Sequence, residues 1–319
     1  MANFIKTVKN NVEYGSTTEQ WTINIDKLSK IRVETEEAKI AVIIQDTPGI
    51  EVVLETYEGG PELSTNLTKD ELEIKALSTK QTFLRKKHNC RLILFVSSSI
   101  ADNWELLTSS GEILCQQLTT KETHLKTSSG DITFSVLEDQ NNVENSGAPS
   151  GDTYLSTSSG DVKIEKIKGR KLRIKTSSGD IHLHNLLMHE ATLHSSSGDM
   201  TGEDICLEKL LFTSSSGNFL IKEVSGQLQG STSSGDVKVT IVEQAPLEIG
   251  TSSGDISIGF LSSILDGKIR VETGSGEIKT NLVMDIEKQE SNCLEGKIGQ
   301  ARTVYQMKAR SGDVYIYEI

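Results

Sequence analysis

Residues 176–181 read Thr-Ser-Ser-Gly-Asp-Ile, and close copies of this stretch return along two thirds of the chain. The glycine of the copies moves forward in steps of 19, 30, 19, 19, 19, 18, 19, 22 and 36 residues, and the last step splits at Gly296. A period of 19 residues with occasional insertions is typical of a solenoid, in which each repeat stacks on its neighbours. The glycines that mark the copies are Gly111, Gly130, Gly160, Gly179, Gly198, Gly217, Gly235, Gly254, Gly276 and Gly312.

Apolar residues follow each glycine at fixed distances of two, four, seven, twelve and fourteen residues. Inward positions on one straight strand differ by even numbers, so each odd step between these positions requires a bend. Three odd steps per repeat predict a three-sided coil with a perimeter on the order of 60 Å. The spacing therefore predicts an all-β fold, a single-stranded parallel β-helix with coils of about 19 residues. By analogy with other β-helices we expect it to be right-handed. After Gly160 the apolar positions are Val162, Ile164, Ile167, Leu172 and Ile174.

The rest of the chain keeps parts of this pattern. Residues 31–110 match the register irregularly, with Glu36-Glu37-Ala38-Lys39 where SSGD should stand, and residues 1–30 are the candidate N-terminal cap. Residues 111–319 carry the regular repeats, and we expect the three parts to form one continuous solenoid domain. The last repeat ends at Ile319 without a cap, which leaves unpaired strand edges and predicts an end-to-end homodimer.

The repeated turn has a physical reading. Inward residues are even-numbered up to Ser178 and odd-numbered from Ile181, so the bend lies at Ser178-Gly179-Asp180. We expect glycine to supply a positive φ there and aspartate to bond nearby amides. Thr176 and Ser178 fit the crowded inner corner, and their hydroxyl groups can bond the coils above and below. The stacked carboxylates repel one another, so either backbone amides and water satisfy them or cations lie between them. This column contains Asp131, Asp161, Asp180, Asp199, Asp236 and Asp255, with Glu112, Glu277 and Asn218 in register, and Asp313 follows the register in the last turn.

Composition limits the function. The net charge of −12 argues against nonspecific binding of nucleic acid, and no specific nucleic-acid partner is expected. The chain shows no secretory signal and no stretch of about 18 apolar residues, which predicts a cytoplasmic protein. Four widely spaced cysteines (Cys90, Cys115, Cys206 and Cys293) fit reduced thiols, and no cofactor is expected.

Two groups of residues are candidate sites. The repeat from Gly160 to Ser178 holds seven basic and two acidic residues, and this patch could bind an unknown acidic protein partner or an anionic membrane. Alternatively, these are soluble side chains on outward strand positions. His182 and His184 lie on one strand face and are candidate metal ligands, although a solvated strand face also explains them. The basic residues are Lys163, Lys166, Lys168, Arg170, Lys171, Arg173 and Lys175.

No nucleophile elbow, phosphate-binding loop, dinucleotide fingerprint or zinc protease motif occurs in the chain. We therefore expect no enzyme, and predict a non-catalytic scaffold or interaction protein. An exported surface adhesin and a polysaccharide-active or metal-dependent enzyme are the alternatives.

The sequence also resembles a known bacterial family. The matching stretches are RVET (32–35), KIAV (39–42), RLILFV (91–96), WELLTSSGEI (104–113) and the successive TSSGDI and SSSGDM turns. Together they resemble the bacterial "putative adhesin" family of β-strand-repeat proteins, a domain of unknown function with repeated TSSGD turns. The resemblance implies a parallel β-helix and, in many Gram-positive members, a link to the cell envelope or to stress responses.

Overall fold

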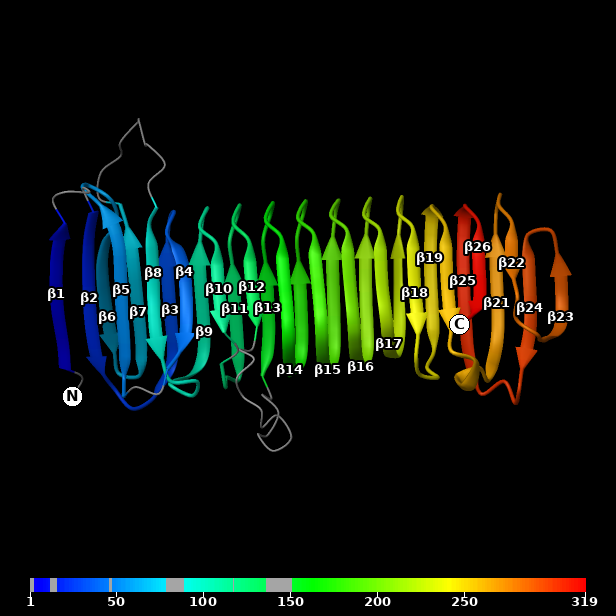
Figure 1. Cartoon of the computed structure of the whole chain (residues 1–319), viewed down its shortest axis with the longest axis horizontal. Helices are drawn as coiled ribbons and strands as arrows, with labels where there is room; N and C mark the ends of the chain where they lie inside the picture. Colours follow the sequence, from blue (N-terminus) through cyan, green and yellow to red (C-terminus); the bar gives the residue numbers. More distant parts are fainter. Residues whose placement is uncertain (1–2, 12–15, 46–47, 79–88, 117, 136–150) are drawn as a thin grey trace. The chain divides into compact units, whose positions relative to one another are not determined.

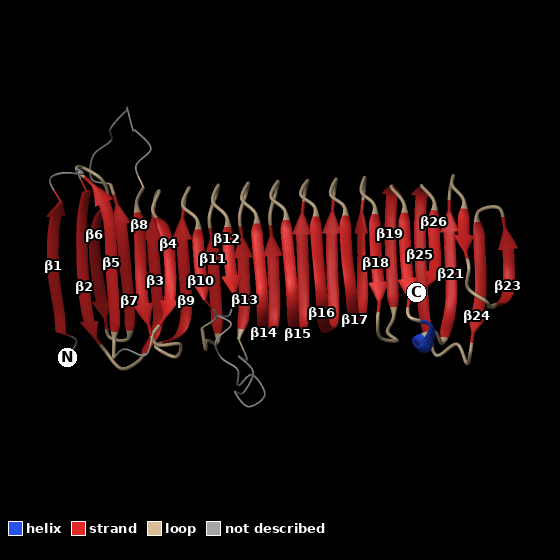
Figure 2. Ribbon diagram, in the orientation of Figure 1, coloured by secondary structure: helices blue, strands red, loops and turns tan. Residues whose placement is uncertain are grey.

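The computed structural model is all-β, with strands labelled β1 to β26 and a short 3-10 helix, η1 (Ser262–Ile264) (Figures 1 and 2). It describes residues 3–11, 16–45, 48–78, 89–116, 118–135 and 151–319. The chain divides into two compact units, Met1–Lys163 and Ile164–Ile319, and each unit is described by itself. Among the described residues, no helix has the length and apolarity needed to cross a membrane.

The N-terminal unit contains two ladders of paired strands. Parallel pairs in the first ladder join β8 to β4, β4 to β10 and β10 to β12. Parallel pairs in the second join β7 to β3, β3 to β9, β9 to β11 and β11 to β13. The strands are β3 (Leu28–Thr35), β4 (Lys39–Ile44), β7 (Glu71–Leu77), β8 (Arg91–Val96), β9 (Ala101–Thr108), β10 (Ile113–Gln116), β11 (Glu122–Lys126), β12 (Ile132–Ser135) and β13 (Asp152–Ser156).

Antiparallel strands extend both ladders of this unit. In the first ladder β1 (Asn3–Asn11) pairs with β2 (Ser16–Asn24), β2 with β5 (Ile50–Tyr57), and β5 with β8. In the second, β6 (Glu62–Thr68) pairs with β7. Antiparallel pairing therefore reaches beyond residues 1–30, the segment predicted as a cap, into residues 50–77.

Regular coils open the C-terminal unit. The long strands are β14 (Val162–Lys175), which begins in the N-terminal unit, β15 (Ile181–Ser195), β16 (Met200–Ser214) and β17 (Phe219–Thr232). Ile181 pairs with Met200, and Met200 pairs with Phe219, each a step of 19 residues in parallel register. This pairing confirms the parallel β-helix that the spacing predicts.

In each regular coil the inward-facing residues switch between odd and even numbers three times, once at each bend. In β15 the buried side chains are Ile181 and Leu183, then Leu186 and Met188, then Ala191, Leu193 and Ser195. The first change falls at Asn185, whose φ is +54°, and the second falls between Met188 and Ala191. The third is the Ser-Ser-Gly-Asp turn itself. We call the three stretches between these bends the first, second and third segments of a coil.

The coils beyond β17 are not stacked in chain order. The first segments pair in the order β17, β18, β20, β26 and β22, and the third segments in the order β17, β19, β25 and β21. The last strand pair thus lies between two coils that precede it in the sequence. The strands are β18 (Val237–Ile241), β19 (Leu247–Ser253), β20 (Ile256–Phe260), β21 (Gly267–Thr273), β22 (Ile278–Thr280), β25 (Thr303–Ser311) and β26 (Val314–Glu318).

Two expectations about this region are wrong. The repeat that ends at Ile319 is not an open edge, because β25 and β26 each pair with a strand on both sides. The edge on which end-to-end pairing was predicted is therefore filled by the chain itself. Gly296 does not form another turn of the solenoid, since it lies in β24 (Cys293–Ile298), which pairs antiparallel with β21 and with β23 (Asp285–Glu290).

Candidate ligand-binding surface

The glycine of the repeated turn is required by close approach between coils. A Cβ atom on Gly198, Gly217, Gly235, Gly254, Gly312 or Gly276 would lie 1.9–2.2 Å from the carbonyl oxygen of the turn glycine in the adjacent coil. No other residue fits at that distance. The expectation of a positive φ is wrong, because none of the turn glycines is among the described residues with positive φ.

Hydroxyl groups bond each turn to its neighbour. The Thr127 hydroxyl accepts a hydrogen bond from the Gly130 amide at 3.1 Å and donates one to the Gly111 carbonyl at 3.1 Å. Thr157 does the same with Gly160 and Gly130, at 3.0 and 3.2 Å. Both threonine side chains are buried, so these bonds satisfy groups that water does not reach.

The aspartate column is a ladder of hydrogen bonds between coils. In the C-terminal unit the Asp180 Oδ1 accepts the Asp199 amide at 2.8 Å, and the Asp236 Oδ1 accepts the Asp255 amide at 2.9 Å. Asn218 takes the same place, because its Oδ1 accepts the Asp236 amide at 2.9 Å. The bonds run to the next coil rather than within the turn, which corrects the expected local aspartate turn. Backbone amides are thus partners of the stacked carboxylates, as in the first of the two hypotheses from the sequence.

The ladder also follows the inserted coil. The Asp255 Oδ1 accepts the Asp313 amide at 2.8 Å, and the Asp313 Oδ1 accepts the Glu277 amide at 2.8 Å. This bond to the Glu277 amide, with one from the Tyr315 hydroxyl, holds the pKa of Asp313 below its usual value. The turn residues are therefore occupied by contacts between coils, which directs the search for a ligand site to the outer side.

The structure distributes the basic residues of β14 over the segments of its coil. Lys166 has a φ of +55° and forms the first bend. Lys168 and Arg170 lie outward on the second segment, and Lys171, Arg173 and Lys175 alternate with buried residues on the third. Lys163 precedes the bend and belongs to the N-terminal unit. The seven residues are thus not one flat patch, but Lys171, Arg173 and Lys175 share one side.

The histidines of the next strand also point outward. His182 lies 2.8 Å from the Thr201 hydroxyl, His189 lies 2.9 Å from Glu208, and His194 lies 2.8 Å from the Thr213 hydroxyl. Each contact joins β15 to β16. Among the described residues, no group of three or more His, Cys, Asp or Glu side chains could hold a metal ion. The metal role predicted for His182 and His184 therefore has no third ligand in this part of the chain.

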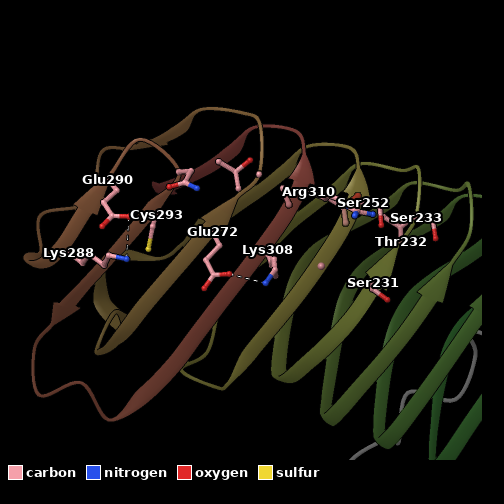
Figure 3. A pocket seen from close by; sticks show the side chains of 16 residues that line it. Ser231, Thr232, Ser233, Ser252, Glu272, Lys288, Glu290, Cys293, Lys308 and Arg310 are labelled. Atoms are coloured by element: carbon pink, nitrogen blue, oxygen red, sulfur yellow. Dashed lines mark ion pairs between the residues drawn. The ribbon is translucent and has the colours of Figure 1, made fainter.

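A groove lies on the outer side of the third segments in the C-terminal unit (Figure 3). Its volume is about 710 Å³, and residues of β17, β19, β25, β21, β23 and β24 line it. Ser231, Gly250, Lys308 and Glu272 stand side by side on four successive strands. A second hollow of about 530 Å³ shares Ser231, Gly250 and Lys308 with the first. The two hollows form one continuous trough across these strands.

Charged pairs line the groove. The Lys308 ammonium lies 2.9 Å from the Glu272 carboxylate, and this bond lowers the pKa of Glu272. Lys288 lies 3.3 Å from Glu290, whose hydrogen bond raises the pKa of Lys288. The Glu272 carboxylate therefore stays ionised near neutral pH and is a poor proton donor. The groove can therefore bind charged and hydroxylated groups, but it lacks an obvious general acid.

This groove has no signal in the sequence pattern. It depends on β25 lying between β19 and β21, a pairing that the 19-residue period does not contain. Gly250 falls outside the repeated turn, so the period also gave no reason to single it out.

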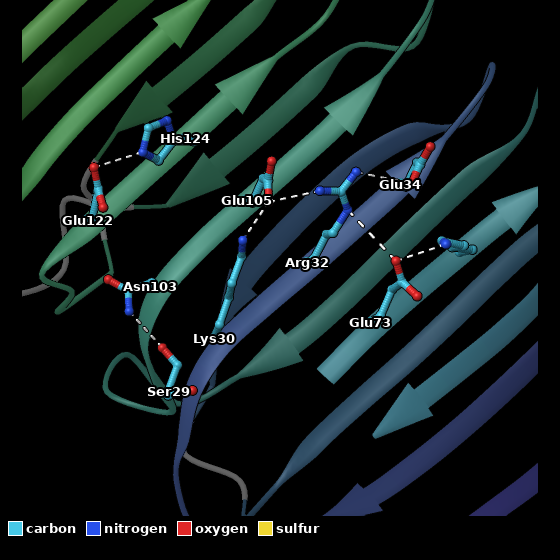
Figure 4. Close-up of polar contacts among 10 residues, drawn as sticks. Ser29, Lys30, Arg32, Glu34, Glu73, Asn103, Glu105, Glu122 and His124 are labelled. Carbon is cyan, nitrogen blue, oxygen red and sulfur yellow. Dashed lines mark hydrogen bonds and ion pairs between the residues drawn. The ribbon is translucent and has the colours of Figure 1, made fainter. Parts of the chain in front are cut away.

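An ion network on the second ladder of the N-terminal unit was also missed (Figure 4). Arg32 lies 3.2 Å from Glu105, 3.4 Å from Glu34 and 3.8 Å from Glu73. Partial burial acts to raise the pKa of Glu105, but the hydrogen bond and charge of Lys30 together with the charges of Arg32 and His124 outweigh it and lower the pKa overall. The network joins β3, β7 and β9 through contacts among its own members, which indicates a structural role.

The buried thiols are poor nucleophiles. Burial raises the pKa of Cys90 to about 11, and it also raises the pKa of Cys115. A thiol is reactive as the thiolate, which neither residue forms near neutral pH.

Comparisons with known proteins cover curated sequences, solved structures and family models. None of the curated proteins matches the chain. Similar solved structures include a "Putative lipid binding protein" from Parabacteroides distasonis (14% identity, 95% of this chain and 96% of that chain, TM-score 0.45). Another is a "putative adhesin" from the same organism (10% identity, 95% and 97% coverage, TM-score 0.46). A third is a "putative adhesin" from Bacteroides fragilis (12% identity, 99% and 97% coverage, TM-score 0.35).

The family assignment rests on the sequence match. The profile of the Toastrack DUF4097 family matches residues 144–317, more than half of the chain. This stretch contains most of the repeated turns. The resemblance to a domain family of unknown function with a β-helical fold is thereby confirmed, and the chain belongs to the Toastrack DUF4097 family.

Proposed function

We propose that this protein is a non-catalytic β-solenoid scaffold that binds an acidic protein partner through the third segment of β14. The observation that carries the proposal is the placement of Lys171, Arg173 and Lys175 on one side of this strand. Leu172 and Ile174 between them are fully buried, which fixes the direction of the three basic side chains. A rigid strand thus presents three cations in a row.

The net charge of the whole chain favours one orientation of an acidic partner on this surface. A cationic strand on a protein with a net charge of −12 attracts an acidic partner locally, while the remaining surface repels it in other orientations. Lys171 lies 3.4 Å from Glu190 on β15, and Arg173 and Lys175 follow it on the same side of the strand. These two residues alternate with the buried Ile174.

The non-catalytic part of the proposal has its own support. The Glu272 carboxylate of the groove is paired with Lys308, which lowers its pKa, and Cys90 and Cys115 are held as thiols. Neither arrangement supplies a proton donor or a nucleophile near neutral pH.

The experiment is affinity purification with charge reversal. The double variant Arg173→Glu, Lys175→Glu should lose partners that the wild-type protein retains, with binding weakened by about tenfold or more in a direct titration of the purified partner. Lys222→Glu, Lys238→Glu is the matched control, because both lysines are exposed on first segments of the same unit. An unchanged set of partners for the Arg173 and Lys175 variant would contradict the proposal. Binding to anionic vesicles in place of a protein would replace the acidic protein with a membrane surface.

The cellular setting is a further part of the proposal. We place the protein inside a bacterial cell with a role in cell-envelope stress, since the resemblance to Gram-positive members of the family implies that association. An exported adhesin is the alternative. Cell fractionation separates the two, because recovery of the protein outside the cell would contradict the intracellular placement.

A further inference from the structure

We propose that the groove across β17, β19, β25 and β21 binds an acidic oligosaccharide. This site is separate from the basic residues of β14, so its test is independent of the proposed partner binding. The inference rests on the shape of the groove, its polar lining and the cations at one end.

The floor of the groove opens at Gly250. A Cβ atom at this position would have Ser231 Cβ at 3.7 Å and the Lys308 carbonyl oxygen at 3.9 Å as its nearest neighbours, and the φ of Gly250 is not positive. A side chain would therefore fit without strain. The absence of one leaves the hollow shared by both halves of the trough.

Part of the lining is polar. Ser231 and Ser252 offer hydroxyl groups and Gln306 offers an amide, whereas the Thr213 hydroxyl contacts His194 and the Gln229 amide donates to Glu248. Hydroxyl and amide groups both donate and accept hydrogen bonds, which suits the many hydroxyl groups of a sugar chain. Strands stack about 4.8 Å apart, so a trough that crosses several of them fits an extended chain of polar units.

The basic side chains of the groove lie on β25 and β23. Lys308 has 67% of its side chain exposed although it contacts Glu272. Arg310 is exposed and has no carboxylate partner within the described residues. Lys288, which lies 3.3 Å from Glu290, is the third basic side chain of the lining (Figure 3). Carboxylate or sulfate groups on a sugar would gain charge-assisted hydrogen bonds at this end.

Other ligand classes fit less well. Sites for small apolar ligands and lipids are lined mainly by hydrophobic and aromatic side chains, and the larger hollow has no aromatic residue in its lining. Single-stranded nucleic acid requires stacking platforms, which are also missing there. A peptide cannot add as a strand here, because β19 and β25 are paired on both sides.

The test is a calorimetric titration of the full chain with an oligogalacturonate of six to eight units, a length chosen to fill the trough. We expect saturable binding that a methyl-esterified, neutral form of the same oligosaccharide does not show. A sulfated oligosaccharide and inorganic sulfate are the other probes, which distinguish a carboxylated sugar, a sulfated sugar and a free anion.

Two variants locate the site. Gly250→Leu should weaken binding about tenfold or more by filling the floor, and Arg310→Gln should weaken it about tenfold by removing one charged contact. Ser257→Leu and Lys238→Gln are matched controls on the first segments, and both should bind like the wild type. Unfolding curves check that all four variants keep their fold.

The proposal is overturned if the wild-type protein binds neither acidic oligosaccharide, or if Gly250→Leu binds as well as the wild type. Equal affinity for the acidic and esterified forms would also overturn it, because the cations would then have no role. Binding of inorganic sulfate alone would show an anion site without a sugar site, which is contrary to the proposal.

Discussion

Each regular coil of the C-terminal unit contains two bends that differ in how freely their sequences vary. The Ser-Ser-Gly-Asp turn keeps its glycine at Gly179, Gly198, Gly217 and Gly235. The first bend after that turn carries Lys166, Asn185, Asp204 and Glu223 at the same place, each with a φ between +54° and +57°. The bend that needs an unusual backbone angle therefore varies, and the bend without one is constant.

Contacts with the adjacent coil, rather than backbone angles, therefore determine which residues a bend in this fold accepts. At the constant turn, the carbonyl oxygen of the adjacent coil leaves no room for a Cβ atom. At the variable bend the side chains of Asn185, Asp204 and Glu223 are exposed, so residues of different size and charge fit. The cost of a positive φ for such residues, about 1–2 kcal/mol each, is tolerated.

The largest expected effect is the loss of a turn glycine. The Cβ atom of Gly217→Ala would lie 1.9 Å from the Gly198 carbonyl oxygen, so two coils must move apart. We expect the free energy of unfolding to fall by about 2–4 kcal/mol. Gly250→Ala is the control, which should change it by no more than about 0.5 kcal/mol. Equal stability of the two variants in urea unfolding would contradict the claim that the adjacent coil requires glycine at the constant turn.

The threonine of the turn should come next. Thr127→Val removes two hydrogen bonds of 3.1 Å and leaves buried polar groups at Gly130 and Gly111. We expect a loss of about 1–3 kcal/mol in the free energy of unfolding. Thr127→Ser keeps the hydroxyl group and should lose less, since Ser195 bonds the Gly198 amide at 2.9 Å in another turn. If valine is tolerated as well as serine, the turn does not depend on its hydroxyl group.

A change to glycine at the variable bend should raise stability, and by less than the losses expected at the constant turn. Glu223→Gly removes a side chain from a residue with a φ of +56°, and it should raise the melting temperature slightly. Glu223→Gln keeps the backbone cost and removes only the charge. A fall in stability with glycine would show that this bend also depends on its side chain.

The same residue predicts a pH dependence. The hydrogen bond and the charge of Asp204 raise the pKa of Glu223. The folded state therefore holds this proton more tightly than the unfolded chain, and the carboxyl lowers stability as pH rises through its titration range. The advantage of Glu223→Gln over the wild type should grow between about pH 4 and pH 7. Melting curves across that range check it.

Much of the fold can be predicted from the sequence because the spacing of buried residues around a bend involves only residues close together in the chain. The odd steps around Ile164, Ile167 and Leu172 predict the bends, and the structure buries these side chains between them. The constant glycines also mark the correct turns. The reason for their constancy was not accessible, because the approach of Gly198 to Gly217 is a contact between coils.

The candidate sites were less predictable. The basic residues around Lys171 are visible in the sequence, but the bend at Lys166 that divides them is not, since lysine is no signal for a positive φ. The order of the last coils was also hidden. Gly312 matches the register of every other turn equally well, so the period does not say that its coil lies between those of Gly254 and Gly276.

The central claim is that the turn column is a ladder between coils, in which the aspartate acts as a hydrogen-bond acceptor. Asp236 tests it most directly, because its Oδ1 accepts the Asp255 amide at 2.9 Å and Asn218 fills the same role in the coil before it. In urea unfolding we expect Asp236→Asn to match the wild type and Asp236→Ala to lose about 1 kcal/mol. If asparagine is as destabilising as alanine, or if calcium stabilises the wild type and not Asp236→Asn, the charge matters and the ladder account is contradicted.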